Sequence, residues 1–209
     1  MMAAERGRFI TLEGGEGAGK STQAAVLEAA LRERGIAVLR TREPGGAAGS
    51  DILRELLLSG RHEWSPLAEV MLHFAARAEH IECTIRPALA AGTWVICDRF
   101  ADSTMVYQGW GQGADRNIIR QLTEMMNLTP DLTLILDVSV EMTQARLAGR
   151  GSVADRYERL GPSFFSRIRE GFLAVAAREP LRCRVVSGEM PQAQVSTALL
   201  GVVKATFAL

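Results

Sequence analysis

A glycine-rich run near the N-terminus constrains the fold of this chain more than any other feature. Residues 14–21 read GGEGAGKS, directly after the apolar run FITLE, and a segment of helical spacing begins at Lys20. The run fits GxxxxGK[ST], in which backbone N–H groups of a flexible loop surround phosphate oxygens in front of a helix N-terminus. We therefore predict a nucleotide-binding P-loop, in which Lys20 contacts the β- and γ-phosphates and Ser21 supplies a hydroxyl to Mg²⁺.

Apolar runs that alternate with helical segments indicate the rest of the architecture. Strands are expected at 8–13, 37–41, 93–98, 132–138 and 183–187. Helices are expected at 20–34, 52–58, 66–91 with a break or second start at Pro87, 115–128, 140–149, 163–177 and 192–207. This order predicts an α/β P-loop NTPase fold, a five-stranded parallel sheet with helices on both faces. We expect one domain over 1–209, with loops at 44–50, 108–115 and 149–161, the last being a small lid and 108–115 a second candidate lid.

The composition argues against several classes of protein. The 209 residues include 24 basic and 24 acidic side chains, so the basic excess typical of nucleic-acid or membrane-surface binding is absent. The first eight residues lack the apolar core of a signal peptide, and no apolar stretch approaches the roughly 20 residues of a membrane span. We therefore expect a cytoplasmic protein with no nucleic-acid or membrane partner. Cys83, Cys97 and Cys183 are widely spaced, and we expect them in the core rather than in disulfides or a zinc site.

Charged residues that follow the predicted strands form a candidate second site. Asp98 and Arg99 follow one strand, and REPGG at 42–46 follows another. The carboxyl ends of parallel strands meet at one edge of a sheet, where ligands bind. Asp98 is preferred over Asp137 as the Mg²⁺ carboxylate, because Arg99 beside it can neutralise an anionic substrate. Arg42 and Arg99 together are expected to hold a monophosphate.

The remaining motifs narrow the function to a small phosphotransferase. The chain contains neither the guanine-reading NKxD run nor the DxxG run of a GTPase switch, and it is too short for a motor ATPase. In the helical segment HFAAR at 73–77, an aromatic residue and an arginine three or four residues apart share one side. One can stack on a base while the other hydrogen-bonds the edge of that base.

With these motifs established, the chain resembles the bacterial thymidylate kinase family over nearly its whole length. The matching runs lie at 13–21, 41–46, 74–77, 87–89, 92–96, 98–99, 103–104, 107–109, 130–134 and 155–156. The combination of REPGG with YQG at 107–109 is the specific part, since a P-loop alone indicates only nucleotide binding. The resemblance implies transfer of the γ-phosphoryl of ATP to dTMP with Mg²⁺, which supplies dTDP for the dTTP pathway. It also implies a homodimer. The segment 66–91, which is long and apolar, is a candidate interface segment, and the same pattern fits a helix buried in the core.

The resemblance further implies a role for each matched residue. ATP is expected at Gly14, Gly15, Glu16, Gly17, Ala18, Gly19, Lys20, Ser21, Thr22 and Arg146, the last stacking on adenine. The acceptor dTMP is expected at Glu16, Arg42, Pro44, Phe74, Arg77, Arg99, Ser103, Thr104, Tyr107 and Gln108. Phe74 would stack near thymine, Arg77 would read its edge, and Glu16 would approach the 3′-hydroxyl. Tyr107 would pack beside the sugar, where a 2′-hydroxyl would crowd it. Ser21 and Asp98 would hold Mg²⁺, and Lys20, Arg99 and Glu16 would act in catalysis.

Two features distinguish this chain within the resemblance. The P-loop carries Gly17 after its acidic residue, where one branch of the family has an arginine. The lid carries Arg150 and Arg156 instead, so the resemblance implies the branch in which lid arginines are catalytic. His73 stands four residues before Arg77, where several members have the stacking aromatic, so either Phe74 stacks alone or His73 shares that role.

Two rival functions follow from the same motifs. A kinase for another nucleoside monophosphate, such as dUMP, would share the fold and differ only in the base pocket. A regulatory protein that binds a nucleotide without transferring phosphate would need the P-loop alone. The pair formed by Arg42 and Arg99 argues against the second rival, because a switch does not need a clamp for an acceptor phosphate.

Overall fold

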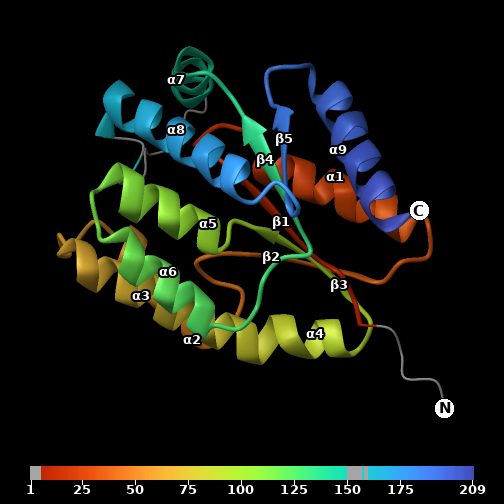
Figure 1. Ribbon diagram of the computed structural model, residues 1–209, viewed down its shortest axis with the longest axis horizontal. Helices are drawn as coiled ribbons and strands as arrows, with labels where there is room; N and C mark the ends of the chain where they lie inside the picture. The colour runs from red at the N-terminus through yellow and green to blue at the C-terminus, as the bar shows by residue number, and fades with distance from the viewer. Residues whose placement is uncertain (1–5, 150–156, 158–159) are drawn as a thin grey trace.

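A five-stranded parallel sheet forms the centre of the molecule (Figure 1). The computed structural model describes residues 6–149, 157 and 160–209. The strands are β1 (Phe9–Gly14), β2 (Val38–Arg42), β3 (Trp94–Asp98), β4 (Leu132–Asp137) and β5 (Cys183–Ser187). Their order is β2-β3-β1-β4-β5, and every neighbouring pair is parallel. The predicted fold class and all five predicted strands are confirmed, with strand ends within one residue of those expected from the apolar runs.

Helices connect the strands and cover both faces of the sheet. They are α1 (Lys20–Arg32), α2 (Ala48–Leu58), α3 (Pro66–His80), η1 (Ile81–Ile85), α4 (Arg86–Ala90), α5 (Ala101–Thr104), η2 (Met105–Gly111), α6 (Arg116–Met125), α7 (Val140–Ala148), α8 (Pro162–Arg178) and α9 (Gln192–Phe207). Side-chain oxygens of Ser65, Asp115 and Ser139 cap the N-termini of α3, α6 and α7. Such caps satisfy backbone N–H groups that have no partner within the helix, and they fix where each helix begins.

The alternation of side chains along β1 divides the core into two layers. Ile10 and Leu12 pack with α1 and α9 on one face of the sheet. Phe9 packs with η1 and α4 on the opposite face, and Thr11 is also fully buried. Because successive strand residues point to opposite faces, Thr11 and Glu13 lie on the Phe9 face. A third cluster, formed by η2, α8 and strand residues of β4 and β5, extends the core on that face.

Three sequence expectations need correction or refinement. Residues 108–111 of the predicted loop 108–115 are helical, because η2 continues the helical path from α5 to Gly111, and only 112–115 form a connection to α6. A Cβ on Gly111 would lie 2.5 Å from Phe164, so this glycine serves close helix packing rather than loop flexibility. The 66–91 helix changes register in η1, just before Pro87, whose ring nitrogen cannot donate a hydrogen bond. Cys97 and Cys183 are buried as expected, whereas Cys83 is exposed.

The elements place the ends of β1, β2 and β3 side by side at one edge of the sheet. The P-loop follows β1, the REPGG turn follows β2, and Arg99 follows β3. The predicted lid at 149–161 lies largely outside the described residues. Within the part of the chain that is described, no helix has the length and apolar character needed to cross a bilayer.

Candidate active site

The P-loop follows β1 in a conformation that only glycine adopts easily. Gly14 has a φ of 134°, and a Cβ at this position would lie 2.5 Å from the carbonyl oxygen of Leu136. Gly19 has a φ of 93° and directly precedes α1. Both residues occupy the positive-φ region that disfavours other side chains. The glycines predicted from the motif are therefore required by the backbone, and the loop turns back over the N-terminus of α1.

Lys20 is the first residue of α1 and is held inside the P-loop. Its Nζ donates hydrogen bonds to the carbonyl oxygens of Gly14 at 3.0 Å and Gly15 at 2.7 Å. Burial, helped by the nearby charge of Arg99, lowers the pKa of Lys20 from 10.5 to about 8. The ammonium thus carries its charge at neutral pH without a fully compensating partner. A bound polyphosphate would supply that compensation.

Ser21 and Asp98 bring two oxygen ligands together beside Lys20. The Ser21 hydroxyl donates a short hydrogen bond to Oδ2 of Asp98, at the end of β3. Hydroxyl and carboxylate oxygens are the hard ligands that Mg²⁺ prefers, and few protein ligands are needed when phosphates supply the rest. The pair therefore fits Mg²⁺. Asp137, the competing carboxylate, is instead bound by Arg169 at 2.7 and 2.9 Å.

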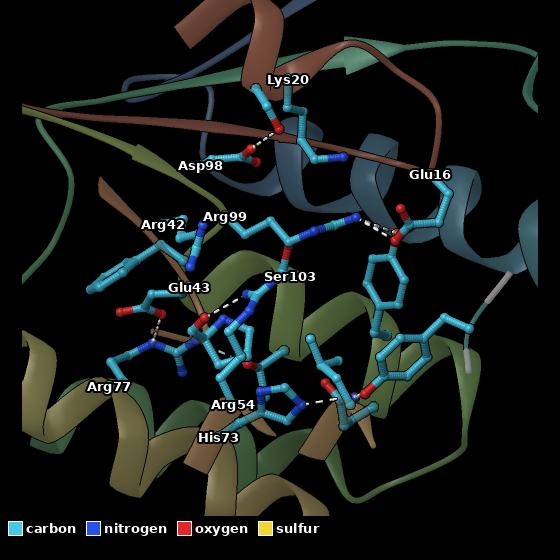
Figure 2. A pocket seen from close by; sticks show the side chains of 18 of the residues that line it. Glu16, Lys20, Arg42, Glu43, Arg54, His73, Arg77, Asp98, Arg99 and Ser103 are labelled. Atoms are coloured by element: carbon cyan, nitrogen blue, oxygen red, sulfur yellow. Dashed lines mark hydrogen bonds and ion pairs between the residues drawn. The ribbon is translucent and has the colours of Figure 1, made fainter. Parts of the chain in front are cut away.

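Arg99 reaches across the cavity to the far end of the P-loop, as Figure 2 shows. Its Nη2 donates to Oε1 of Glu16 at 2.5 Å and to the Tyr107 hydroxyl at 3.1 Å. Its Nη1 donates to the carbonyl oxygen of Gly14 and to Oγ of Ser103, both at 3.2 Å. Burial acts to lower the pKa of Arg99, but the negative charge of Glu16 outweighs it and raises that pKa. The guanidinium is therefore a permanent, well-oriented cation.

Arg77 forms the opposite end of the cavity. Its side chain is 2% exposed, and its Nε donates to Oε2 of Glu43 at 2.8 Å. One terminal nitrogen, Nη2, donates to Oγ1 of Thr104 at 3.0 Å. The other, Nη1, is buried and has no hydrogen-bond partner among the described residues. A buried donor without a partner is costly, so Nη1 indicates a place where a ligand supplies an acceptor.

Arg42 and Arg54 add positive charge between these two ends. Arg42 ends β2, as predicted, and lines the cavity together with Pro44. Arg54 comes from α2 and donates from Nη1 to the carbonyl oxygen of Pro44 at 2.6 Å. Burial and the proximity of Arg42 lower the pKa of Arg54. Arg54 is not predicted by the sequence motifs. The available signal is its position one helical turn after Asp51, in the helix that follows the REPGG turn.

A second missed group closes the cavity beside Arg77. Tyr157 donates from its hydroxyl to Oε1 of the buried Glu69 at 2.8 Å. Gln108 donates from Nε2 to the same Glu69 oxygen at 2.9 Å and to the Tyr157 hydroxyl at 3.0 Å. His73 lies 3.4 Å from that hydroxyl through its Nε2. Of the two neighbouring candidates for base stacking on α3, His73 therefore lines the cavity, whereas Phe74 is buried with Val70 and Ile119.

These groups surround one cavity of about 330 Å³ (Figure 2). The residues predicted from the sequence that line it are Glu16, Gly17, Gly19, Lys20, Ser21, Thr22, Arg42, Pro44, Arg77, Asp98, Arg99, Ser103, Thr104, Tyr107 and Gln108. The described predicted residues outside its lining are Gly14, Gly15, Ala18, Phe74 and Arg146. One cavity thus joins the P-loop to the second site predicted at the ends of β2 and β3.

Arg146 contacts the P-loop from α7, outside the cavity lining. Arg146 donates to the carbonyl oxygens of Gly17 at 3.1 Å and Gly188 at 2.8 Å, so α7 is tied to the P-loop and to the turn after β5. Arg150 and Arg156 lie outside the described residues. The lid-arginine prediction therefore stays a prediction.

A P-loop that shares its cavity with an arginine-rich pocket on the same parallel sheet defines a class of protein, the P-loop kinases of small phosphorylated acceptors. Comparisons with known proteins identify the family within that class. The thymidylate kinase family model matches residues 12–199. Curated thymidylate kinases from Chromohalobacter salexigens and Gluconobacter oxydans are 51% and 48% identical over 88% and 96% of this chain, and over 88% and 95% of their own chains.

A solved structure agrees with the sequence matches. The crystal structure of thymidylate kinase from Ehrlichia chaffeensis superposes with a TM-score of 0.78 at 35% identity, covering 95% of this chain and 99% of that one. This chain therefore belongs to the thymidylate kinase family.

Proposed function

We infer that this chain is an enzyme that phosphorylates dTMP to dTDP with ATP as the phosphoryl donor. The observation that carries this inference is the shared cavity, in which Lys20 and Arg99 lie at one end and Arg77 at the other. A donor phosphate at the P-loop and an acceptor phosphate beside Arg99 would meet in the space between them. Family membership supports the same reaction.

The phosphate of dTMP is proposed to bind at Arg42, Arg54 and Arg99. All three side chains line the cavity near the carboxyl ends of β2 and β3. Guanidinium groups suit this role because they present paired N–H donors to phosphate oxygens and stay charged. The ion pair between Arg99 and Glu16 holds the guanidinium in place before the acceptor arrives.

The thymine ring is proposed to bind between Arg77, Gln108 and His73. The unpartnered Nη1 of Arg77 would donate to a carbonyl oxygen of the pyrimidine. Cytosine presents an amino donor at its equivalent edge, so the same nitrogen would select against it. We assign the stacking contact to His73, because Phe74 does not line the cavity in the described structure.

The sugar is proposed to lie beside Tyr107 and Glu16. The Tyr107 hydroxyl donates to Glu16 at 3.0 Å, and the ring of Tyr107 lies under Arg99. In this position the ring would crowd a 2′-hydroxyl, and Glu16 would accept a hydrogen bond from the 3′-hydroxyl. The ring of Tyr107 therefore favours a deoxyribonucleotide over a ribonucleotide.

Catalysis is proposed to depend on positioning and charge neutralisation. The acceptor phosphate oxygen is itself a competent nucleophile, so no strong base is needed. Lys20 would contact the β- and γ-phosphates, and Ser21 and Asp98 would hold Mg²⁺, which neutralises phosphate charge when bound. Arg150 and Arg156 are proposed as lid arginines. The rate effect of such an arginine is large in other phosphoryl-transfer enzymes, so Arg150→Ala or Arg156→Ala should lower kcat at saturating substrates.

We also propose that the chain forms one domain and acts as a cytoplasmic homodimer. The helices α2, α3 and α6 are neighbours (Figure 1), and each has exposed apolar side chains. They are Ile52, Leu56, Leu67, Met71 and Met125. Exposed apolar side chains on neighbouring helices are typical of a protein interface. The predicted segment 66–91 contributes two of these residues.

A panel of acceptors tests this proposal. ADP release from ATP and Mg²⁺ is measured with dTMP, dUMP, dCMP, dGMP and UMP at equal concentrations. We expect dTMP to give the highest kcat/KM, with UMP and dCMP much poorer because of the Tyr107 wall and Arg77. A best acceptor other than dTMP would replace the assigned substrate. No ADP release with any acceptor would favour a nucleotide-binding regulatory protein instead.

A further inference from the structure

The main chain at Arg99 adopts a conformation that its sequence alone does not explain. Arg99 has a φ of 69°, a left-handed value that residues other than glycine rarely adopt. Its N–H donates to the carbonyl oxygen of Leu12 on β1 at 2.9 Å. Strained residues persist where the surroundings determine them, and they gather at functional sites. In this conformation Arg99 leaves β3 and turns its side chain across the cavity (Figure 2).

Glu13 is the side chain that holds this turn. It precedes the P-loop on β1 and is fully buried. Its Oε1 accepts a hydrogen bond from the N–H of Phe100 at 2.7 Å, directly after Arg99 in the chain. Its Oε2 accepts one from Oγ of Ser103 at 2.6 Å. Ser103 in turn accepts from Nη1 of Arg99, so Glu13 supports both the backbone and the guanidinium of that residue.

A buried carboxyl at this position is costly, which argues for a specific role. Burial, together with the nearby charge of Asp102, raises the pKa of Glu13 to about 8. The neighbouring positions on the same side of β1, Phe9 and Thr11, are occupied by residues that bury at lower cost. A polar group is required only where a backbone N–H and a hydroxyl need acceptors.

We propose that Glu13 is a positioning residue, which fixes Arg99 for the acceptor phosphate through Phe100 and Ser103. The proposal rests on the assigned role of Arg99 in binding dTMP. Glu13 contributes two acceptors and is not among the described residues that line the cavity. Its carboxyl geometry therefore matters more than its charge.

The test compares Glu13→Met, Glu13→Gln and a control variant in steady-state kinetics. Glu13→Met keeps the side-chain volume and removes both acceptors, so KM for dTMP should rise by about 10- to 100-fold while KM for ATP changes less than about threefold. Glu13→Gln keeps the acceptor for Phe100 and a polar contact for Ser103. It should restore KM for dTMP to within about fivefold of the wild-type value.

The matched control is Thr11→Val on the same face of the same strand. It removes the buried hydrogen bond between Thr11 and Thr133 at 2.8 Å, so it should lower stability to urea while leaving KM for dTMP unchanged. A double variant adds a second readout. In an Arg99→Met background, Glu13→Met should raise KM for dTMP no further, because it acts through Arg99.

The outcomes separate this proposal from the proposed function. A wild-type protein that does not phosphorylate dTMP would overturn the function. An active wild type with Glu13→Met at the wild-type KM for dTMP would overturn the positioning role alone. If Glu13→Met does not fold, Glu13→Gln decides: a folded Gln variant whose KM for dTMP rises by more than about 30-fold would contradict the importance of acceptor geometry.

Discussion

Lys20 is a buried cation whose charge suits the binding of an anionic ligand. Its ammonium donates hydrogen bonds to two carbonyl oxygens. Burial lowers its pKa to about 8, which means that the folded state disfavours the charged form. Such a residue stabilises a bound anion at the expense of the empty protein, a common trade-off between stability and function.

Replacing Lys20 should therefore stabilise the ligand-free fold. Between pH 8 and 10.5 the unfolded chain binds more protons than the folded one at this residue, so stability rises with pH across that window. At pH 7 Lys20 is charged in both the folded and the unfolded state, so the full free-energy cost of burying the ammonium applies. Lys20→Met should therefore raise the free energy of unfolding by about 1–3 kcal/mol. It should also flatten that pH dependence. Urea denaturation from pH 7 to 10 measures both effects, and Lys204→Met is the control. A destabilised Lys20→Met protein would contradict this account.

Arg77 should determine acceptor binding without affecting ATP. Arg77→Gln removes the unpartnered Nη1 donor, so KM for dTMP should rise by about 100-fold. KM for dUMP should rise similarly, because both bases present the same carbonyl edge. Arg86→Gln, on the partly exposed α4, controls for loss of an arginine. Steady-state kinetics with varied dTMP and varied ATP measure the KM for each substrate. An unchanged KM for dTMP would show that Arg77 does not bind the base.

A functional residue can be predicted from the sequence where it directly follows a strand or lies in a tight motif. Lys20, Arg42 and Arg99 are of this kind, because parallel strands bring their carboxyl ends to one edge. Residues on helix faces are harder to place. Adjacent helical residues point about 100° apart, so the choice between His73 and Phe74 depends on how α3 rotates against its neighbours. Arg54 likewise reaches the cavity only through the packing of α2.

Among the elements, η2 and α8 pack closely enough to position the acceptor pocket. Gly171 of α8 faces η2, and a Cβ there would lie 3.0 Å from side-chain atoms of both Trp110 and Val106. The same η2 segment carries Tyr107 and Gln108 into the cavity. The contact therefore links helix packing to substrate binding. The sequence suggested a loop at 108–115 because its glycines resemble turn residues, whereas Gly109 and Gly111 permit close approach of neighbouring side chains.

Two glycine substitutions separate helix propensity from packing. Gly171→Ala should lower the free energy of unfolding by about 1–3 kcal/mol through overpacking, and it should raise KM for dTMP by displacing η2. Gly201→Ala in α9 has no atom within 4 Å of its new Cβ, so it should instead raise stability by about 0.5–1 kcal/mol. Urea denaturation and dTMP kinetics distinguish the two. Equal stabilisation by both substitutions would contradict the packing argument.

In the whole molecule, the five-stranded parallel sheet and the helices on both of its faces agree with what the apolar pattern predicts, whereas the strand order comes from the structure. Runs of buried β-branched residues and intervening helices are local signals, and they require little long-range information. The exposed apolar face of α2, α3 and α6 is not predicted by the apolar pattern. It appears only after the helices are packed, because exposure is a property of the assembled fold.

Charges placed on that face should separate the proposed dimer. A double variant with Leu67→Glu and Met71→Glu introduces charge at two half-exposed apolar positions of α3, so it should elute as a monomer. Leu181→Glu, at a 93% exposed leucine outside this face, should leave the assembly unchanged. Light scattering after size exclusion gives the mass directly. A wild-type protein that is monomeric at micromolar concentration would exclude the dimer.

One cavity is proposed to bring the γ-phosphoryl of ATP to the phosphate of dTMP. A single turnover with ATP labelled on its γ-phosphoryl, Mg²⁺ and excess dTMP follows this transfer. We expect the label to appear in dTDP in a one-to-one ratio with ADP, and Arg99→Met should slow the transfer. Label released as inorganic phosphate, or ADP formed without dTDP, would contradict this proposal.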